Sequence, residues 1–394
     1  MRIVEIGKLL FNIPAMVVDS STQRISRLTP LEAVLASLDK GIEPVPPRAC
    51  SLDSACGRVL AADVTASTLP AAPIALRDGF AVAAGDVADA SSYVPMPFAA
   101  PPQRVDAGEP MPAGTDAVLP LDAVTFAGGR AAAIAAIAPG EGVLAAGGDV
   151  APGTILRRAG AVLRASDLGV MAAAGIADIS VREPRIRISR GGGAKTPVIE
   201  AVVEMLMRAV SAAGGTVFNA DGEPERLYGA LGEARAHAGL VVGGTGSGRG
   251  DSSVRVLAQR GHVEAHGIAV SPGETAAIGA IGTRPVLLVP GRLDSALAIW
   301  LLIGRHMLAR LAGGQIEDTP RILPLKRKVT STIGLTELVP VRYDRDATYG
   351  AVADPLASGY LSFEVLTGSD GWISIPADSE GFAAGTPVAV RPWP

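Results

Sequence analysis

The stretch Leu240-Val241-Val242-Gly243-Gly244-Thr245-Gly246-Ser247-Gly248-Arg249-Gly250-Asp251 is the starting point for interpreting the chain. Its apolar half is too short for a helix and breaks into glycines, which predicts a buried strand that delivers a loop to the carboxyl edge of a sheet. Asp251-Ser252-Ser253 then gives a helix-start signal. Free N–H groups and the helix dipole favour negative charge at such a loop. The pattern predicts a site for a phosphate-bearing ligand, with a tight turn as the alternative.

The composition indicates a folded protein of several domains. At 394 residues, the chain exceeds one core, since a domain takes about 100–200 residues. The 47 Gly and 30 Pro predict many turns and short strands around aliphatic cores. A net charge of −4 gives no general attraction to nucleic acid or to an anionic membrane.

Cysteine usage and the apolar runs bear on the compartment. The chain has two cysteines, Cys50 and Cys56, and their spacing suggests neither zinc nor a disulfide scaffold. Reduced thiols and a cytoplasmic location are the default expectation. We expect no signal peptide at Met1–Lys8 and no membrane span, although residues 296–303 come closest to one.

Changes of pattern along the chain suggest where its domains begin and end. Thr29-Pro30-Leu31-Glu32 predicts a capped helix start, and residues 70–154 break into strands and turns. From Arg185 onward strands and helices alternate, with strands predicted over 185–190, 239–244 and near 285–289, a helix starting at Thr196-Pro197 and a helix over 225–238. This order argues for a mostly parallel sheet covered on both faces. We expect an extension (1–28), an elongated discontinuous β/helix domain (29–69 and 156–183), an inserted small β-barrel (70–155), a three-layer α/β domain (184–314) and a C-terminal β-barrel (319–394).

The order of several motifs resembles one family. The motifs are Ala75-Leu76-Arg77-Asp78-Gly79-Phe80, Ala107-Gly108-Glu109-Pro110, Gly147-Gly148-Asp149, the glycine loop from Gly243 to Asp251, Ser271-Pro272-Gly273-Glu274, and Pro290-Gly291 with Ser295. In this order they resemble the molybdopterin molybdenumtransferases, the MoeA and gephyrin E-domain family. The likeness covers roughly residues 29–394. It implies an α+β multidomain homodimer that inserts molybdate into adenylylated molybdopterin with Mg²⁺, and an α/β domain with the molybdopterin-binding fold.

The resemblance also implies roles for individual residues. Asp78 and Asp251 are the candidate catalytic residues, and Asp78, Asp149, Asp221 and Asp251 are candidate Mg²⁺ ligands, since Mg²⁺ prefers hard oxygen donors. For each aspartate the alternative is a cap or turn residue. The candidate ligand-binding residues are Arg190, Gly243, Gly244, Thr245, Gly246, Ser247, Gly248, Arg249, Ser271, Pro272, Gly273, Pro290, Gly291 and Arg292.

The chain departs from the family pattern where charge matters. Arg190-Gly191-Gly192-Gly193-Ala194 stands where the family has T-G-D-E-L, so both acids of that motif are absent. Gly267, Ser271 and Glu274 stand in the lysine-bearing segment, so the cations for molybdate and phosphate are absent too. Arg190, Arg249 and Arg292 border the predicted loops. They either rebuild an anion site or are solvated surface cations.

Two functions remain open at this stage. One is an enzyme that inserts molybdate or tungstate into adenylylated molybdopterin. The other is a non-catalytic carrier of molybdopterin or the molybdenum cofactor that serves an apo molybdoenzyme. A weaker third alternative, molybdopterin adenylyl transfer, rests on the likeness of Gly243-Gly244-Thr245-Gly246 to the sister adenylyltransferases.

Overall fold

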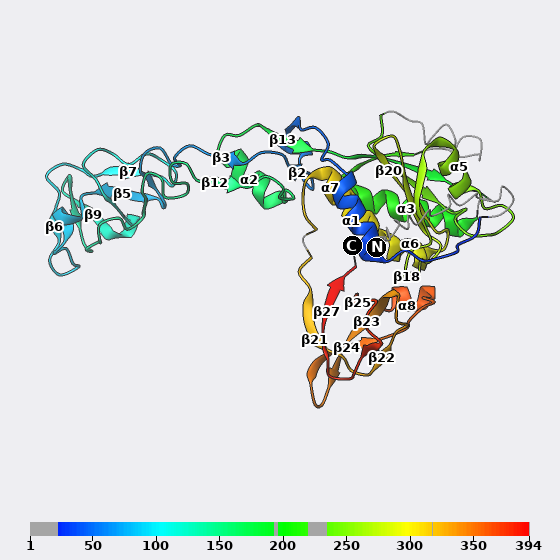
Figure 1. The fold of residues 1–394 in the computed structure, drawn as a ribbon. Helices are drawn as coiled ribbons and strands as arrows, with labels where there is room; N and C mark the ends of the chain where they lie inside the picture. The colour runs from blue at the N-terminus through cyan, green and yellow to red at the C-terminus, as the bar shows by residue number, and fades with distance from the viewer. Residues whose placement is uncertain (1–22, 193–195, 220–234, 317, 394) are drawn as a thin grey trace, which may run out of the picture. The chain divides into compact units, whose positions relative to one another are not determined.

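A computed structural model describes residues 23–192, 196–219, 235–316 and 318–393. The chain divides into two compact units, one formed by residues up to Pro46 with Arg182–Pro394 and the other by Pro47–Val181 (Figure 1). Each unit is described by itself below. The multidomain α+β architecture is confirmed.

The larger unit is built on a six-stranded sheet of order β15-β14-β16-β20-β19-β17. The first four strands run parallel, and β19 and β17 are antiparallel additions at one edge. Strand β15 lies on one side of β14, and the later strand β16 lies on its other side. The direction in which the chain winds across the sheet therefore reverses between β14 and β16. In chain order the strands are β14 (Arg185–Arg190), β15 (Thr216–Asn219), β16 (Ala238–Val242), β17 (His262–His266), β19 (Ala277–Ile281) and β20 (Arg284–Val289).

Helices cover both faces of this sheet, as predicted. Leu240 and Val242 of β16 belong to a core with α1, α3 and α6 to α7, whereas Val241 between them belongs to a core with α5. This alternation follows from the two-residue period of a strand. The helices are α1 (Leu31–Gly41), α3 (Pro197–Ala212), α5 (Ser253–Arg260), α6 (Leu293–Ile299), the π turn η4 (Trp300–Gly304) and α7 (Arg305–Ala312).

The helix starts test the capping predictions. Thr196 caps α3 by accepting a hydrogen bond from the N–H of Ile199. The predicted capping box of α1 is wrong: Pro30 occupies the cap position, and no side chain caps the helix. The predicted helix over 225–238 falls mostly outside the described residues, and Ala238 already belongs to β16.

The segment Leu293–Ala312 is long and apolar enough to cross a membrane, but 67% of its most apolar window is buried inside the unit. Trp300, 1% exposed, packs in the core. A Cβ on Gly304 would lie 2.5 Å from the ring of Trp300, so the helix needs glycine there. This burial is that of a core helix.

The C-terminal part of this unit is a second sheet of order β18-β23-β25-β27-β21, with β24 paired to β23. β18 joins it to the α/β part, because β18 pairs in parallel with β23. Within the described residues no sheet closes on itself, so the prediction of barrels is not confirmed. The elements are β18 (Val270–Ser271), β21 (Arg321–Pro324), β22 (Val329–Thr330), β23 (Thr336–Asp346), β24 (Gly350–Pro355), α8 (Phe363–Thr367), β25 (Gly371–Ile375), β26 (Gly381–Phe382) and β27 (Pro387–Pro392).

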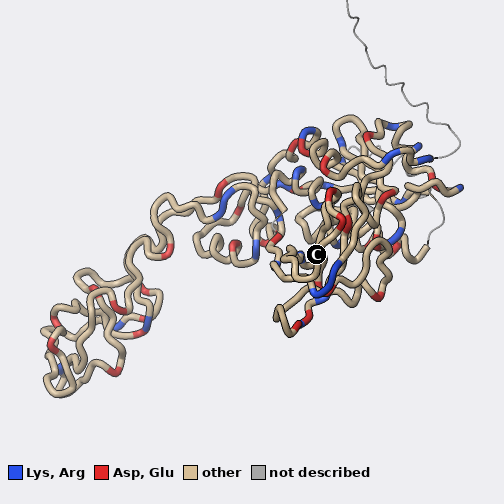
Figure 2. The backbone as a smooth tube through the Cα atoms, turned by 60° about the horizontal axis from the view of Figure 1, so that its bottom comes forward, with Lys and Arg blue, Asp and Glu red and all other residues tan. Residues whose placement is uncertain are grey.

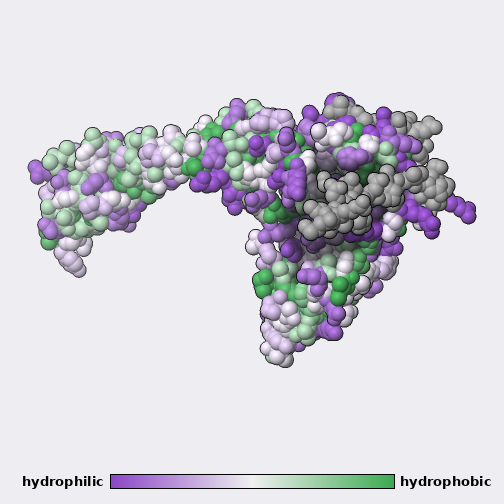
Figure 3. Space-filling view, in the orientation of Figure 1, coloured by the Kyte–Doolittle hydropathy of each residue, from purple (hydrophilic) through white to green (hydrophobic). Residues whose placement is uncertain are grey.

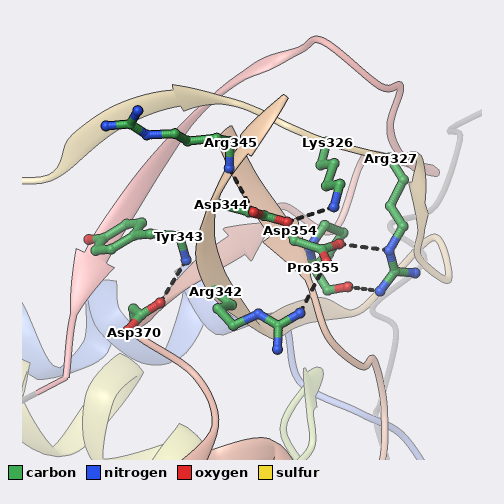
Figure 4. Close-up of polar contacts among 9 residues, drawn as sticks. All are labelled: Lys326, Arg327, Arg342, Tyr343, Asp344, Arg345, Asp354, Pro355 and Asp370. Atoms are coloured by element: carbon green, nitrogen blue, oxygen red, sulfur yellow. Dashed lines mark hydrogen bonds and ion pairs between the residues drawn. The ribbon is translucent and has the colours of Figure 1, made fainter. Parts of the chain in front are cut away.

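Ion pairs cover the β23–β24 hairpin (Figure 4). Lys326 pairs with Asp344 at 2.6 Å, and Arg327 and Arg342 both approach Asp354. The hydrogen bond from Lys326 lowers the pKa of Asp344, and the same bond raises the pKa of Lys326. Because the cations already face carboxylates, we interpret the cluster as a support for the hairpin.

The smaller unit is a chain of small sheets. β1 and β2 pair with β13, and β3 pairs with β12, so residues 48–65 and 155–182 form one discontinuous structure. The segment between them has its own apolar core around Leu119, Val82 and Ala133. The elements are β1 (Arg48–Ser51), β2 (Val59–Leu60), β3 (Val64–Thr65), β4 (Ile74–Ala75), β5 (Gly79–Val82), β6 (Met96–Pro97), β7 (Gln103–Val105), β8 (Ala117–Leu119), β9 (Val124–Ala127), β10 (Arg130–Ala133), β11 (Val143–Leu144), β12 (Ile155–Arg157), α2 (Ala165–Ala173) and β13 (Asp178–Arg182).

Candidate functional site

Three glycine turns meet at the carboxyl edge of the parallel sheet. Gly191 follows β14, Gly243 follows β16, and Gly291 comes two residues after β20. A Cβ on Gly191 would lie 2.6 Å from the carbonyl oxygen of Gly243, and a Cβ on Gly291 would lie 3.5 Å from the Cα of Gly243. The three backbones therefore pack against one another. Their position between β14 and β16 is where ligands bind in open α/β sheets, outside the carboxyl ends at the reversal of winding.

The loop after β16 is held in a left-handed turn. Gly243 and Gly244 have φ values of 86° and 70°, a region that favours glycine. The hydroxyl of Ser253, at the start of α5, donates to the carbonyl of Gly243 at 2.7 Å. A Cβ on Gly191 would lie 2.0 Å from that hydroxyl. Strand end, loop and helix start thus form one interlocked backbone structure.

The helix start differs from the prediction in one respect. The sequence predicted that the first N–H groups of α5 would be available to a ligand, but they are occupied. The N–H of Ser253 donates to the carbonyl of Gly244, and those of Val254 and Arg255 donate to the side chain of Gln23. Sequence reasoning missed Gln23, because it lies more than 200 positions from the loop and no local motif marks it.

The loop beyond Gly244 keeps free backbone donors. Thr245, 3% exposed, is held through its hydroxyl by Thr275 at 3.1 Å and through its carbonyl by His266 Nε2 at 2.9 Å. The N–H groups of Thr245, Gly246 and Ser247 make no hydrogen bond to any described part of the chain. Donors of this kind suit a phosphate.

Asp251 closes the loop. Its Oδ2 accepts a hydrogen bond from the N–H of Gly248 at 2.9 Å, and its own N–H donates to the carbonyl of Gly248 at 3.0 Å. A Cβ on Gly246 would lie 2.9 Å from the same Oδ2. A side chain at position 246 would therefore push this carboxylate away from its place over the loop. Asp251 therefore acts as a turn residue, which was the alternative to a catalytic or metal-binding role. Its other carboxylate oxygen is left for a further contact.

The three arginines of the anion hypothesis have different surroundings. Arg190 forms a two-point pair with Glu200, with Nε–Oε1 at 2.8 Å. Arg292 pairs with Asp294 in the same manner and stacks 4.5 Å from the ring centre of Tyr360. Arg249 is exposed at the tip of the glycine loop. Two of the three guanidinium groups therefore already face a carboxylate.

Asp294 ties the start of α6 to the loop that precedes α8. It is 3% exposed and accepts hydrogen bonds from the N–H groups of Ser295 and Leu361. Burial alone would raise the pKa of Asp294, but the hydrogen bonds from Arg292, Leu361 and Ser295 outweigh it and hold this pKa below its ordinary value. Asp294 is therefore a structural anion beside the glycine edge.

The loop Ser271-Pro272-Gly273 borders a polar cavity of about 290 Å³. A Cβ on Gly273 would lie 2.9 Å from Ile299 of α6, so this loop packs on the helix that follows Pro290-Gly291. The carboxylate of Glu337, 7% exposed, accepts from the N–H of Gly359 at the cavity wall. Hydroxyls line the rest of the cavity, from Ser271, Thr330, Ser331, Thr332 and Ser358.

Two of the remaining candidate aspartates, Asp78 and Asp149, belong to the smaller unit. Asp78 is exposed in the smaller unit, where its Oδ1 accepts from the N–H of Ala107 at 2.8 Å. Asp149 is exposed in a turn, and its N–H donates to the carbonyl of Leu69. Asp221 lies outside the described residues. Throughout the described ranges, no group of three or more His, Cys, Asp or Glu side chains could hold a metal ion.

The sheet, with helices on both faces and a reversal of winding between β14 and β16, places the larger unit in the class of doubly wound α/β folds. Comparison with known proteins then identifies the family. The family model "MoeA N-terminal region (domain I and II)" matches residues 24–175, and "MoeA C-terminal region (domain IV)" matches residues 323–393. The chain belongs to the MoeA family.

Individual relatives agree with this membership. Molybdopterin molybdenumtransferase 1 of Mycobacterium tuberculosis is 28% identical over 73% of both chains. Molybdopterin molybdenumtransferase 2 of the same species is 27% identical and covers 91% of this chain and 97% of that protein. The fold is similar to the crystal structure of a molybdopterin biosynthesis moeA protein from Pyrococcus horikoshii OT3, with a TM-score of 0.73, 24% identity, and 93% of this chain and 100% of that one covered.

Proposed function

We propose that this protein acts in molybdenum cofactor biosynthesis as a molybdopterin molybdenumtransferase that binds adenylylated molybdopterin at the carboxyl edge of its parallel sheet. The observation that carries the proposal is the meeting of the Gly191, Gly243 and Gly291 turns, in a chain of the MoeA family. Glycine lets a ligand approach the backbone closely, and the free N–H groups of Thr245, Gly246 and Ser247 suit its phosphates.

The polar cavity beside Ser271 is the proposed place for the molybdate. Its hydroxyls donate hydrogen bonds to oxygen without supplying charge. The carboxylate of Glu337 at the cavity wall disfavours a dianion there. Glu274, which accepts a hydrogen bond from the N–H of Gly273, adds a second carboxylate to the neighbouring loop. This chemistry predicts a weaker oxyanion site than one built from lysines.

Those carboxylates support a second candidate function, a non-catalytic carrier of molybdopterin or the finished cofactor. Arg190 and Arg292 are paired with Glu200 and Asp294, so they are poor substitutes for the absent lysines. Such a protein would bind the pterin through backbone donors and deliver it to an apo molybdoenzyme.

Mg²⁺ does not fit the described residues of one chain. Asp251 is a single carboxylate at the loop, one of its oxygens is held by Gly248, and no three-ligand group exists in the described ranges. A homodimer in which Asp78 of one chain faces the loop of the other would add a carboxylate. Phe126 of the smaller unit and Phe363 of the larger one are exposed, and Figure 3 shows apolar residues scattered among polar ones on the face that it draws.

The charge distribution agrees with a small-molecule ligand. Figure 2 shows Lys and Arg interspersed with Asp and Glu along the described backbone. A net charge of −4 gives the chain no general electrostatic attraction to nucleic acid.

One experiment separates the two candidate functions. Purified protein is supplied with adenylylated molybdopterin, Mg²⁺ and molybdate, and both nucleotide release and reconstitution of an apo molybdoenzyme are followed. Release with reconstitution supports the transferase, and binding without release supports the carrier. An absence of binding contradicts both. Omitting molybdate is the control, because pterin carriage does not need it.

A further inference from the structure

We propose that Gln23 is a positioning residue that aims the backbone donors of the glycine loop at the ligand. The proposal rests on the proposed function, because it concerns the same loop, and it gives residues 23–29 a role that the sequence did not indicate. Gln23 precedes the first residue of the family match at residue 24.

The amide of Gln23 makes four hydrogen bonds to two structures. Its Oε1 accepts from the N–H groups of Val254 at 2.9 Å and Arg255 at 3.1 Å, in the first turn of α5. Its Nε2 donates to the carbonyls of Gly244 at 3.0 Å and Gly246 at 2.9 Å. The residue is 4% exposed. Because this buried amide makes all four hydrogen bonds, it fixes the glycine loop and the first turn of α5 in one geometry.

These bonds determine where the loop donors point. In a planar trans peptide, the carbonyl of one residue and the N–H of the next point in opposite directions. Because Gln23 holds the carbonyls of Gly244 and Gly246, the N–H groups of Thr245 and Ser247 are directed away from it. These N–H groups are among those without an acceptor in the described chain. Gln23 thus leaves two donors free for a ligand while it caps the helix behind them.

The segment that carries Gln23 is anchored to the sheet edge. The N–H of Thr29 donates to the carbonyl of Gly267, and the N–H of Ala269 donates back to Thr29. Gly267 has φ +90°, and a Cβ there would lie 2.4 Å from Ile25. The segment of Gln23 is therefore tied to the end of β17 as well as to the glycine loop. A cavity of about 720 Å³ beside it lets water replace a shortened side chain.

The two halves of the amide can be separated by substitution. Gln23→Glu keeps an acceptor for the N–H groups of Val254 and Arg255, and a carboxylate suits a helix amino terminus. It removes both donors to the carbonyls of Gly244 and Gly246. Gln23→Ala removes both halves. Gln259→Ala is the matched control, since Gln259 is an exposed glutamine of α5 that lines the same cavity.

The test combines backbone hydrogen exchange of the full chain with its affinity for adenylylated molybdopterin. For Gln23→Glu we expect faster exchange at the hydrogen-bonded loop amides of Gly248, Asp251 and Ser253 and unchanged exchange at Val254 and Arg255. We also expect about tenfold weaker binding, because the two hydrogen bonds that hold the loop carbonyls are lost. For Gln23→Ala we expect faster exchange at both places. Gln259→Ala should match wild type in every measurement.

Two results would overturn the proposal. One is wild-type loop exchange in Gln23→Glu. The other is unchanged or tighter ligand binding in both Gln23 variants. If the wild-type protein binds no molybdopterin, the proposed function fails, whereas the exchange measurement still decides whether Gln23 sets the loop.

Discussion

Gly191→Ala is expected to disrupt the glycine edge. The new Cβ would lie 2.0 Å from the hydroxyl of Ser253, 2.6 Å from the carbonyl oxygen of Gly243 and 2.8 Å from Val241. Carbon contacts are favourable only near ~3.5–4.0 Å, and a backbone carbonyl cannot rotate away as a side chain can. Overpacking costs about 1–3 kcal/mol, and losing the Ser253–Gly243 hydrogen bond adds about 1 kcal/mol. We expect a loss of about 2–4 kcal/mol in the free energy of unfolding.

Urea unfolding of wild type and Gly191→Ala measures this loss, and titration with adenylylated molybdopterin measures the affinity. Gly41→Ala is the control in the same unit: no atom lies within 4 Å of its new Cβ, so it should be neutral or stabilise by up to ~1 kcal/mol, as alanine does in a helix. If Gly191→Ala unfolds like wild type and binds equally well, the close packing of the three turns is not what forms the site.

Three further predictions concern charge and protonation. Burial, and then the charge of Arg185, lower the pKa of His237 from 6.5, so the folded state favours the neutral imidazole. The stability of the protein should therefore fall as the pH drops below 6.5. In thermal melts, His237→Gln should show a smaller fall than wild type. The pKa of Asp294 lies below its ordinary value of 3.8, so its contribution to the stability of the fold is present above pH ~4 and is lost in stronger acid. Asp294→Asn should be less stable than wild type at neutral pH and should lose less stability on acidification. Equal acid-unfolding curves for the two proteins would contradict this prediction. Arg249→Ala should weaken molybdopterin binding several-fold and reduce its salt dependence, as expected for an exposed cation near a phosphate, whereas Arg130→Ala in the smaller unit should change neither.

Much of the α/β architecture could be predicted from the sequence, because it follows from local patterns. Apolar runs that end at a glycine or at a Pro-Gly pair predicted β16 and β20, and the strand predicted over Arg185–Arg190 matches β14. Thr196-Pro197 marked the start of α3 for the physical reason that Thr196 caps it. Closed barrels were not confirmed, since closure depends on pairing between distant edge strands, which local alternation does not encode.

The candidate site was predictable in its backbone but not in its side-chain partners. Glycines at positive φ leave a clear signal, and Gly243 and Gly244 adopt that conformation. The partners of Arg190 and Arg292 were hidden, although Glu200 and Asp294 lie nearby in sequence, because spacing alone does not tell whether a guanidinium faces a carboxylate or a ligand. Gln23 was hidden by its distance along the chain.

The most direct test of the central claim is hydrogen exchange of the full-length protein with and without adenylylated molybdopterin. Binding at the carboxyl edge predicts protection of backbone amides in residues 190–192, 243–251 and 290–292, with the largest effect at Thr245–Ser247. The smaller unit's core around Leu119 should not change. Saturable binding that protects other segments and leaves these three turns unchanged would contradict the account.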